Sequence, residues 1–458
     1  MKIRIKVLSP VHIGCGETYS GLNYIIDKGN LYYIDPDRVL ENLDGYQNTF
    51  VKWLESESNK IAGFESKIDE FKKTRKFKEK KEYTSKLRPI TNQFHLKKFC
   101  YLNKVPLTLL NNAANYAIPV KEKIFDSTDI AKFISQINRH YIPGTEIKGA
   151  IRTAVLYKLF KDNNNLFQEI KKDIEKFGSK NSGKIDTVKN KKRPNSNIKK
   201  ELNKKMRELA QKMENLALKS PGKNDAKYDL LKYLFISDSN LREPFDTLAI
   251  AYATPLNSSR FFKLYYEYCK PETVFKFEDI SVENTAIKMN KLGFTAKQKN
   301  VVSSLESIFA CCHDFSHDLL EEEITFYKTH GKIPIVDHLR NIAKVNTAES
   351  PVLRIGKDQG FLSLTMGLLF KKKEPDLYEN VLIHATKSKS YDSSHGGPLP
   401  KTRKVVHYDG DELTSGWVKI LPQENDFSIE SKQLKSLSDN KSPTKDSLNA
   451  LMNKWGKP

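Results

Sequence analysis

The alternation of apolar and polar residues predicts strands near the N-terminus. Between residues 2 and 8, Ile3, Ile5 and Val7 alternate with Lys and Arg side chains, which is the period-two pattern of a half-buried strand. Two further strand-like segments, at residues 23–27 and 31–35, flank Lys28-Gly29-Asn30. This arrangement predicts a β-hairpin with its turn at the glycine.

Helical patterns follow the hairpin. Asp35-Pro36-Asp37 predicts a helix start, with Asp35 as N-cap and Pro36 as the first helical residue. Residues 52–98 alternate Lys with Glu and predict exposed helices. A further amphipathic helix is expected at residues 128–138. Its apolar positions are Ile130, Phe133, Ile134 and Ile137.

The stretch 141–156 combines a strand end, a turn and a helix start. Pro143-Gly144 marks the turn, and Thr145 occupies the expected N-cap position. Lys148 and Arg152 lie four residues apart on one helix face, near the free amides of a helix N-terminus, which favour anions. Phosphate binding is therefore one interpretation, and an ordinary helix with two solvated cations is the other. The expected buried stripe comprises Ile147, Ile151, Ala154 and Val155.

The C-terminal half alternates strand-like runs with helical ones. Thr295 and Gln298 have the spacing of a capping box, and a buried helical stripe is expected from Val301 to Cys312. A short amphipathic helix is expected at residues 443–455. Apolar and aromatic runs predict strands at about residues 233–236, 248–254, 261–268, 274–277, 405–406 and 416–420.

The net charge of the chain favours a polyanionic partner. The 458 residues include 77 basic and 56 acidic side chains, a formal net charge of +21. Such an excess of positive charge gives information about binding partners rather than about the fold, and nucleic acid is the common polyanionic partner. Residues 161–225 are rich in Lys and Asn, with a dense basic run at 189–194. We expect an inserted helical or partly disordered segment there, either solvated or in contact with RNA phosphates.

Two classes of protein are excluded by composition. The five cysteines are few and unevenly spaced, so no disulfide framework is expected. No run of about 20 apolar residues offers a membrane span, and the N-terminal segment lacks a continuous apolar signal region. A cytoplasmic location without membrane contact is therefore expected.

Two glycine-bearing segments carry candidate phosphate chemistry. Gly14 and Gly16 bracket Cys15, where the backbone can bend and its amides can face a ligand. The segment lacks the third glycine of a dinucleotide fingerprint. The second segment is a short basic loop that predicts a phosphate cradle, although its spacing is not that of a P-loop. The residues of this cradle are Arg354, Gly356, Lys357 and Gly360.

A metal centre is not expected. His313 and His317 are four residues apart on a predicted helix, so both rings can face one side. The residue after the first histidine is Asp314 rather than the glutamate of a zinc-protease motif, and a third ligand is not evident. We predict no metal and no cofactor.

Taken together, these motifs resemble the RAMP proteins of CRISPR systems, and among them the family of fifth subunits of the type III-A Csm effector complex. The resemblance rests on PVHIGCGE, YIPGTEIKGAIR, VLRIGKDQG, PKTRK and GWVKI, in this order. It implies an α+β fold, with an RNA-recognition-like (ferredoxin-like) RAMP core elaborated by helical insertions. The expected parts are an N-terminal core at 1–160 with an insert at about 50–100, a charged insert at 161–230, a C-terminal half at 231–422 with a helical region at about 295–345, and a polar tail at 423–458.

The resemblance also implies a function. It predicts a non-catalytic subunit that binds CRISPR RNA and caps the filament of Csm backbone subunits at the guide 3′ end. Csm backbone and small subunits are the expected partners, and host nucleases would be recruited for guide maturation in antiviral defence. The predicted RNA-binding residues are His12, Gly14, Gly16, Lys148, Gly149, Arg152, Arg354, Gly356, Lys357, Gly360, Lys401 and Arg403.

Catalysis by this chain is not expected. Target-slicing relatives carry an aspartate in a Gly-Ile-Asp-Asn context, where this chain has Gly21-Leu22-Asn23-Tyr24. An amide cannot replace a carboxylate as a general base or hard metal ligand. The alternative is a RAMP endoribonuclease that processes precursor CRISPR RNA without metal, with His12 as its acid or base and Lys148 assisting.

Overall fold

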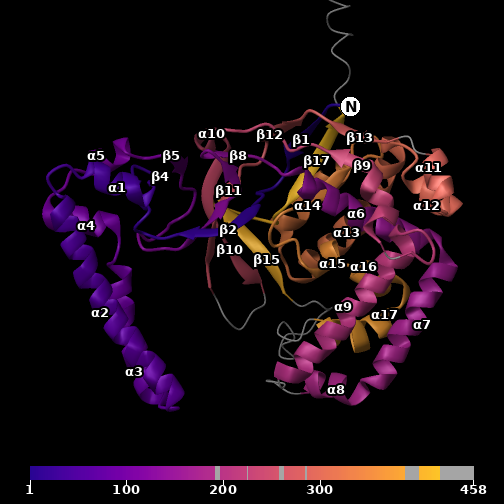
Figure 1. The fold of residues 1–458 in the computed structure, drawn as a ribbon, viewed down its shortest axis with the longest axis horizontal. Helices are drawn as coiled ribbons and strands as arrows, with labels where there is room; N and C mark the ends of the chain where they lie inside the picture. The colour runs from indigo at the N-terminus through magenta and orange to yellow at the C-terminus, as the bar shows by residue number, and fades with distance from the viewer. Residues whose placement is uncertain (191–195, 224, 257–261, 284–285, 387–401, 423–458) are drawn as a thin grey trace, which may run out of the picture.

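The computed structural model describes residues 1–190, 196–223, 225–256, 262–283, 286–386 and 402–422. Two β-sheets form the centre of the molecule, with helices around them (Figure 1). One has four strands in the order β12-β1-β17-β14, and the other has six in the order β16-β15-β10-β11-β6-β2. Their strands are β1 (Ile3–Val7), β2 (Gly14–Tyr19), β6 (Ile130–Phe133), β10 (Leu248–Leu256), β11 (Leu264–Cys269), β12 (Val274–Phe277), β14 (Val352–Arg354), β15 (Arg403–Tyr408), β16 (Asp411–Leu413) and β17 (Trp417–Pro422).

Strand β1 joins the two ends of the described chain. It pairs antiparallel with both β12 and β17, so that Ile5 lies opposite Phe275 and Ile420. Ile3, Ile5 and Val7 are fully buried, which confirms the strand predicted for residues 2–8. Segments far apart in the sequence therefore share one sheet and one core.

The six-stranded sheet uses the predicted aromatic strands. β11 pairs antiparallel with β10 and parallel with β6, and β2 closes the edge beside β6. Tyr265, Tyr266 and Tyr268 are buried in β11. These aromatic rings therefore belong to the core.

The helix predicted at residues 128–138 is wrong. This segment forms β6 and then a small hairpin of β7 (Ser135–Gln136) and β8 (Arg139–His140). Ile130 and Phe133 are buried, whereas Ile137 at the hairpin tip is 86% exposed. The helical spacing was misleading because pairing with β2 and β11, which is not encoded locally, supplies the backbone hydrogen bonds.

The first glycine segment, where a bend was expected, forms part of a strand. β2 begins at Gly14 and pairs with β6, with a register irregularity between Gly14 and Thr18. Gly16 has a φ of +89°, a conformation that glycine adopts without steric cost. An edge strand needs backbone partners on one side only, which leaves its other side open.

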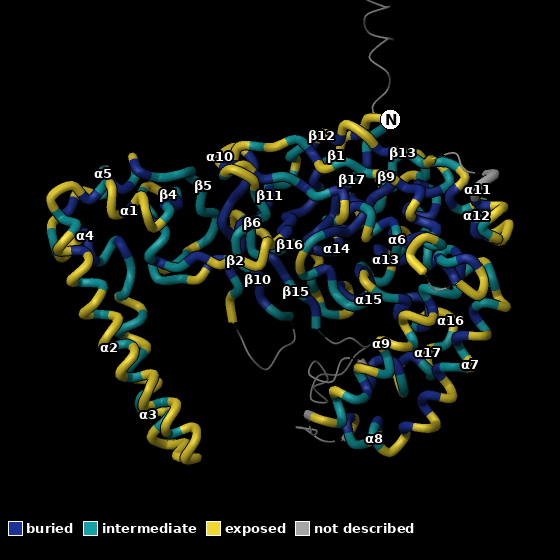
Figure 2. The backbone as a smooth tube through the Cα atoms, in the orientation of Figure 1, coloured by how far each residue is buried: buried dark blue, intermediate teal, exposed yellow. Residues whose placement is uncertain are grey.

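A small N-terminal unit has its own core. The predicted hairpin is confirmed as β3 (Tyr24–Asp27) and β4 (Asn30–Tyr33), with Lys28 and Gly29 at positive φ in the turn, and β5 (Tyr116–Pro119) extends the sheet. The predicted exposed helices are also confirmed, and two of them project as an arm (Figures 1 and 2). The helices of this unit are α1 (Pro36–Asn42), α2 (Gln47–Lys73), α3 (Phe77–Asn92), α4 (Leu96–Asn103) and α5 (Leu107–Asn112).

One of the two N-caps predicted in the N-terminal third is confirmed. Asp35 holds the N-cap position of α1, although its side chain makes no capping hydrogen bond. The N-cap of α6 (Gly144–Asp162) is Pro143 rather than Thr145. The amide of Gly144 instead donates to Asp238 Oδ1 at 2.8 Å. A side chain from another segment thus replaces the local cap, which the sequence pattern did not reveal.

Helix α6 packs against α13 (Leu305–Thr329) beside the four-stranded sheet. Its predicted stripe is fully buried, at Ile147, Ile151, Ala154 and Val155. The capping box of Thr295 and Gln298 is confirmed at the start of α12 (Ala296–Val301). The helix expected to run on to Cys312 is interrupted, because the chain turns after α12 and α13 starts again behind the N-cap Ser304.

Most of the described part of the charged insert is helical. Figure 1 shows α7, α8 and α9 at the opposite end of the molecule from the α2–α3 arm. Residues 191–194 of the basic run and the helix expected at 443–455 lie outside the described residues. Within the described ranges, no helix is both long and apolar enough to cross a bilayer. The remaining elements are α7 (Asn164–Lys180), α8 (Ser182–Asn190), α9 (Ser196–Leu218), β9 (Leu234–Ile236), α10 (Pro244–Thr247), β13 (Ile280–Val282), α11 (Ala286–Lys291), α14 (Ile333–Lys344), α15 (Phe361–Leu364), α16 (Gly367–Lys373), α17 (Pro375–Leu377) and α18 (Ile383–Thr386).

Candidate nucleic-acid interface

The two glycine segments meet in an open cleft of about 450 Å³. One wall is the start of β2, and another is the loop that follows β14. The first turn of α6 and strands β6 and β11 complete the lining. The residues that line the cleft are His12, Ile13, Gly14, Gly16, Glu17, Thr18, Ala131, Lys132, Glu146, Tyr266, Gly356 and Lys357.

Backbone hydrogen bonds hold the two glycine segments together. The amide of Lys357 donates to the carbonyl oxygen of His12 at 2.7 Å. Gly356 has a φ of +76°, and a Cβ atom at this position would lie 2.4 Å from the same carbonyl oxygen. Only glycine fits this contact without displacing backbone. The sequence predicted both segments as phosphate sites, and the structure places them side by side.

Two cations and two carboxylates line the cleft. Lys357 is exposed, while the Lys132 side chain is only 14% exposed and its Nζ lies 3.5 Å from Glu17 Oε2. Glu146 Oε2 accepts a hydrogen bond of 3.3 Å from the Gly356 amide, which fixes the second loop against α6. Lys132 was missed by sequence reasoning because it fell in a wrongly predicted helix, although its place between apolar residues also fits a strand.

His12 forms the floor of the cleft. Its side chain is buried, and Nδ1 lies 2.8 Å from the backbone oxygen of Glu267. Burial, opposed by that hydrogen bond and reinforced by the nearby charge of Lys357, lowers the His12 pKa to about 4. The ring is therefore neutral at pH 7, and it packs against Tyr266 with a centroid distance of 4.8 Å. Because Nδ1 faces a carbonyl oxygen, it carries the single ring proton, so Nε2 can accept a hydrogen bond from RNA but the ring supplies no charge.

The cations of α6 have protein partners. Arg152 donates to both carboxylate oxygens of Asp229, at 3.1 and 2.9 Å, and to Glu214 at 3.0 Å. Lys148 Nζ donates to the carbonyl oxygen of Leu234 at 2.7 Å. These contacts tie α6 to neighbouring segments, and neither side chain lines the cleft. Gly149, between them, has open space around it.

The predicted arginines of the C-terminal half are also engaged. Arg403 Nε donates to Glu323 Oε1 at 2.8 Å, and Arg354 Nη1 lies 3.2 Å from Glu323 Oε2. The Arg354 and Arg403 side chains are 2% and 4% exposed. Both guanidinium groups are thus internal and packed around one carboxylate. Gly360 is the N-cap of α15 with a φ of +84°, and Lys401 lies outside the described residues.

The histidine pair on α13 has local acidic partners. The His313 and His317 rings are 6.2 Å apart between centroids. His313 lies 3.3 Å from Asp314, and His317 lies 3.3 Å from Glu321. In the part of the chain that the structure describes, no group of three or more His, Cys, Asp or Glu residues is arranged to hold a metal ion.

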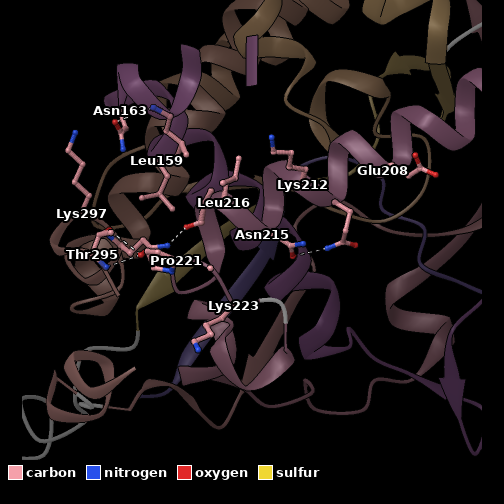
Figure 3. Close-up of a pocket in the computed structure, with 15 residues that line it drawn as sticks. Leu159, Asn163, Glu208, Lys212, Asn215, Leu216, Pro221, Lys223, Thr295 and Lys297 are labelled. Carbon is pink, nitrogen blue, oxygen red and sulfur yellow. Dashed lines mark hydrogen bonds between the residues drawn. The ribbon is translucent and has the colours of Figure 1, made fainter. Parts of the chain in front are cut away.

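A second cavity, of about 700 Å³, lies among α6, α7, α9 and α12 (Figure 3). Its polar groups are mostly turned to protein partners. Gln298 Nε2 donates to the carbonyl oxygens of Ala217 and Lys219, and Lys212 Nζ lies 2.6 Å from Asp173. Of the predicted RNA-binding residues that the structure describes, none lines this cavity. The cleft between the glycine segments is therefore the better candidate interface.

Known proteins with similar sequence or structure agree with the predicted family. The family model for the RAMP superfamily matches residues 4–440. A protein of Methanocaldococcus jannaschii, described as "CRISPR system Cms protein Csm5", is 25% identical over 392 residues, which cover 82% of this chain and 76% of that protein.

Two solved structures share the fold. A chain of the cryo-EM structure of a Csm–crRNA–target RNA ternary complex of a type III-A CRISPR-Cas system has a TM-score of 0.60 and 20% identity, covering 92% of this chain and all of that one. The crystal structure of T. onnurineus Csm5 has a TM-score of 0.60 and 19% identity, covering 91% and 99%. These matches confirm the predicted α+β fold. Because the family model spans nearly the whole sequence, the chain belongs to the RAMP superfamily.

Proposed function

We propose that this chain is a CRISPR RNA-binding subunit of a type III-A Csm effector complex. The observation that carries the proposal is the cleft, in which two glycine segments and two lysines meet beside the start of α6. Lysines and closely approached backbone suit contacts with the RNA backbone, which position a strand without reading its sequence. The likeness to Csm5 of M. jannaschii and to a chain of a Csm–crRNA complex supports the same function.

The structure narrows the set of residues proposed to contact RNA. Lys357 and Lys132 would supply charge, while His12 and the glycines at 14, 16 and 356 would shape the surface. The side chains of Lys148, Arg152, Arg354 and Arg403 bond within the protein and do not line the cleft. For these four we propose a supporting role in holding the walls of the cleft.

The finer roles rest on the family resemblance. In the proposed complex this subunit caps the filament of backbone subunits at the guide 3′ end, contacts backbone and small subunits, and supports guide maturation by recruiting host nucleases. These roles do not require catalysis by the chain itself.

Two observations support a non-catalytic subunit. His12, the candidate acid or base of an endoribonuclease, is buried and has a pKa of about 4, so it is a poor proton donor at neutral pH. Asn23 stands where slicing relatives carry an aspartate, and its Oδ1 accepts a hydrogen bond from the Ser20 amide. Incubation with repeat-containing RNA in EDTA tests this view, and a defined cleavage product would favour the endoribonuclease.

The binding proposal is tested by a salt series with labelled CRISPR RNA. Each phosphate contact to single-stranded RNA contributes about −0.7 to the slope of log K against log salt. The double substitution Lys132→Ala/Lys357→Ala should therefore weaken binding and flatten the slope by about 1.4. Lys357→Glu provides a second variant at an exposed position, where folding should be unaffected.

A matched control removes two exposed lysines elsewhere. Lys328 and Lys344 are exposed on α13 and α14, so Lys328→Ala/Lys344→Ala should leave the slope unchanged. Wild-type binding by Lys357→Glu would show that the cleft does not hold RNA. The same comparison with backbone subunits present tests assembly.

A further inference from the structure

Helices α2 and α3 form a rigid arm that stands away from the body of the molecule (Figure 1). At about 1.5 Å per residue, the 27 residues of α2 extend roughly 40 Å. The two helices pack along an aromatic seam, in which Tyr83 lies 5.8 Å from Phe64 and 5.2 Å from Phe71 between ring centroids. At the base, Trp53 packs on Phe99 of the N-terminal core. The arm is therefore braced along its length and anchored at one end.

The positive charge of the arm is concentrated at its tip. Residues 72–81, reading KKTRKFKEKK, contain seven cations and one carboxylate. In contrast, residues 47–71 contain three lysines and five acidic residues, and residues 82–92 contain two cations and one acidic residue. A general excess of lysine in the chain would not produce this contrast within one hairpin. The positive charge is therefore a local property of residues 72–81.

Most tip cations are available to a ligand. In the described structure, Lys72 lies 3.6 Å from Asp69, but the other cations of residues 72–81 form no ion pair. The tip residues 72–79 are all exposed, as Figure 2 shows for this end of the arm. Phe77 sits among them with 68% of its surface exposed, and Arg75 turns the chain with a φ of +57°.

We propose that the tip of the α2–α3 arm is a second nucleic-acid site, which binds a single strand of RNA. Cations on both sides of an exposed aromatic ring provide phosphate contacts together with a surface on which a base can stack. This combination tolerates any sequence, because every base has a flat face. The rigid arm would hold the strand away from the body, at a place distinct from the cleft.

Single-stranded RNA fits the tip better than an acidic protein does. An acidic protein partner would explain the charge but would leave Phe77 flanked by cations on both sides, whereas protein interfaces concentrate apolar groups at a centre depleted of charge. A strand of RNA presents phosphates and bases in alternation along its length. At the tip, the exposed ring of Phe77 lies within a run of exposed cations that includes Lys76 and Lys78, so phosphate contacts and base stacking are available close together.

The test uses the whole protein and a labelled single-stranded RNA in fluorescence anisotropy. Lys78→Ala/Lys81→Ala removes two exposed cations from α3, where alanine favours helix. We expect about tenfold weaker binding at low salt and a slope flattened by about 1.4. Phe77→Ala should weaken binding roughly tenfold without changing the slope. The matched control, Lys52→Ala/Lys60→Ala, removes two exposed lysines from the shaft of the same arm and should bind like wild type.

A cross-link locates the contact directly. RNA containing 4-thiouridine is irradiated on the protein, which is then cleaved after glutamate to release residues 71–79 with Phe77 near the end. Cross-linked nucleotide on this peptide, lost in Phe77→Ala, is the expected result. Wild-type affinity and slope for both tip variants, without this cross-link, would overturn the proposal and leave an acidic protein as the partner of the tip. Variants of Lys132 and Lys357 test the cleft separately, so either site can fail alone.

Discussion

Replacing Glu323 by Gln tests whether Arg354 and Arg403 serve the core rather than RNA. The Glu323 side chain is 2% exposed and is the carboxylate shared by both guanidinium groups. Burial alone would raise its pKa, but the charges of Arg403 and Arg354 hold the Glu323 pKa below its ordinary value. The carboxyl is therefore ionised at neutral pH. Its contribution to stability is present above the unfolded pKa and is lost as pH falls through the lower folded pKa.

The substitution Glu323→Gln removes the buried carboxylate that Arg354 and Arg403 share. Removing one partner of a buried ion pair costs about 3–5 kcal/mol, because the other charge stays desolvated. For a chain of 458 residues the unfolding entropy is about 1 kcal/mol/K, so Tm should fall by about 4 °C in scanning calorimetry. The slope of RNA binding against salt, measured below the transition, should stay at its wild-type value.

A neighbouring carboxylate provides the control. Glu321 lies on the same helix but its side chain is 57% exposed, and exposed ion pairs contribute at most about 1 kcal/mol. Glu321→Gln should therefore change Tm far less than Glu323→Gln. The reasoning is refuted if Glu323→Gln has the same Tm as the wild type. It is also refuted if Arg403→Ala flattens the salt slope of RNA binding while its Tm is unchanged.

Three further predictions concern the cleft and its supports. Gly356→Ala should lower the free energy of unfolding by roughly 1–3 kcal/mol and weaken RNA binding, because φ at this position is +76° and a Cβ would meet the His12 carbonyl. The control is Gly149→Ala, at a helix position with open space around it. Equal urea unfolding midpoints for the two variants would contradict the argument. Burial raises the pKa of Glu267 to about 7, so the contribution of the protonated carboxyl to folding stability is full below the ordinary pKa of 4.5 and is lost as pH rises through 7. Glu267→Gln should therefore reduce the fall in Tm between pH 5 and pH 8. A fall as large as that of the wild type would be evidence against this assignment. Arg152→Ala should lower the free energy of unfolding by about 1.5–3 kcal/mol, because the charged hydrogen bonds to Asp229 are lost. If stability is unchanged and the salt slope of RNA binding is flattened, Arg152 contacts RNA instead.

Local patterns predicted many of the elements correctly. The strand at residues 3–7, the hairpin with Gly29 in its turn and the buried stripe of α6 depend on the spacing of apolar residues and on a turn chemistry that short segments contain. The capping box at Thr295 is also a local signal. The same reasoning failed where a distant segment decides the structure. Residues 128–138 form a strand and a hairpin because β6 pairs with β2 and β11, and the Gly144 amide is capped by Asp238.

The candidate site was predicted only in part. The two glycine segments were recognised from composition, but their meeting depends on β1, β6 and β14 lying in sheets whose strands are distant in sequence. Lys132 joined the cleft only through that pairing. Arg354 and Arg403 looked like phosphate ligands because a charged residue carries no local mark of the carboxylate it will meet.

By itself, the amino-acid sequence determined the family, the net positive charge and the elements whose periodicity is strong, since these are properties of the residues in order. Only the tertiary structure decided which cations are available. Lys357 and the arm tip remain open to a ligand, while Arg152 is paired with Asp229, and Arg354 and Arg403 share Glu323. The physical reason is that burying a charge is costly unless a partner of opposite sign lies beside it. That partner is brought by the fold from up to 80 residues away.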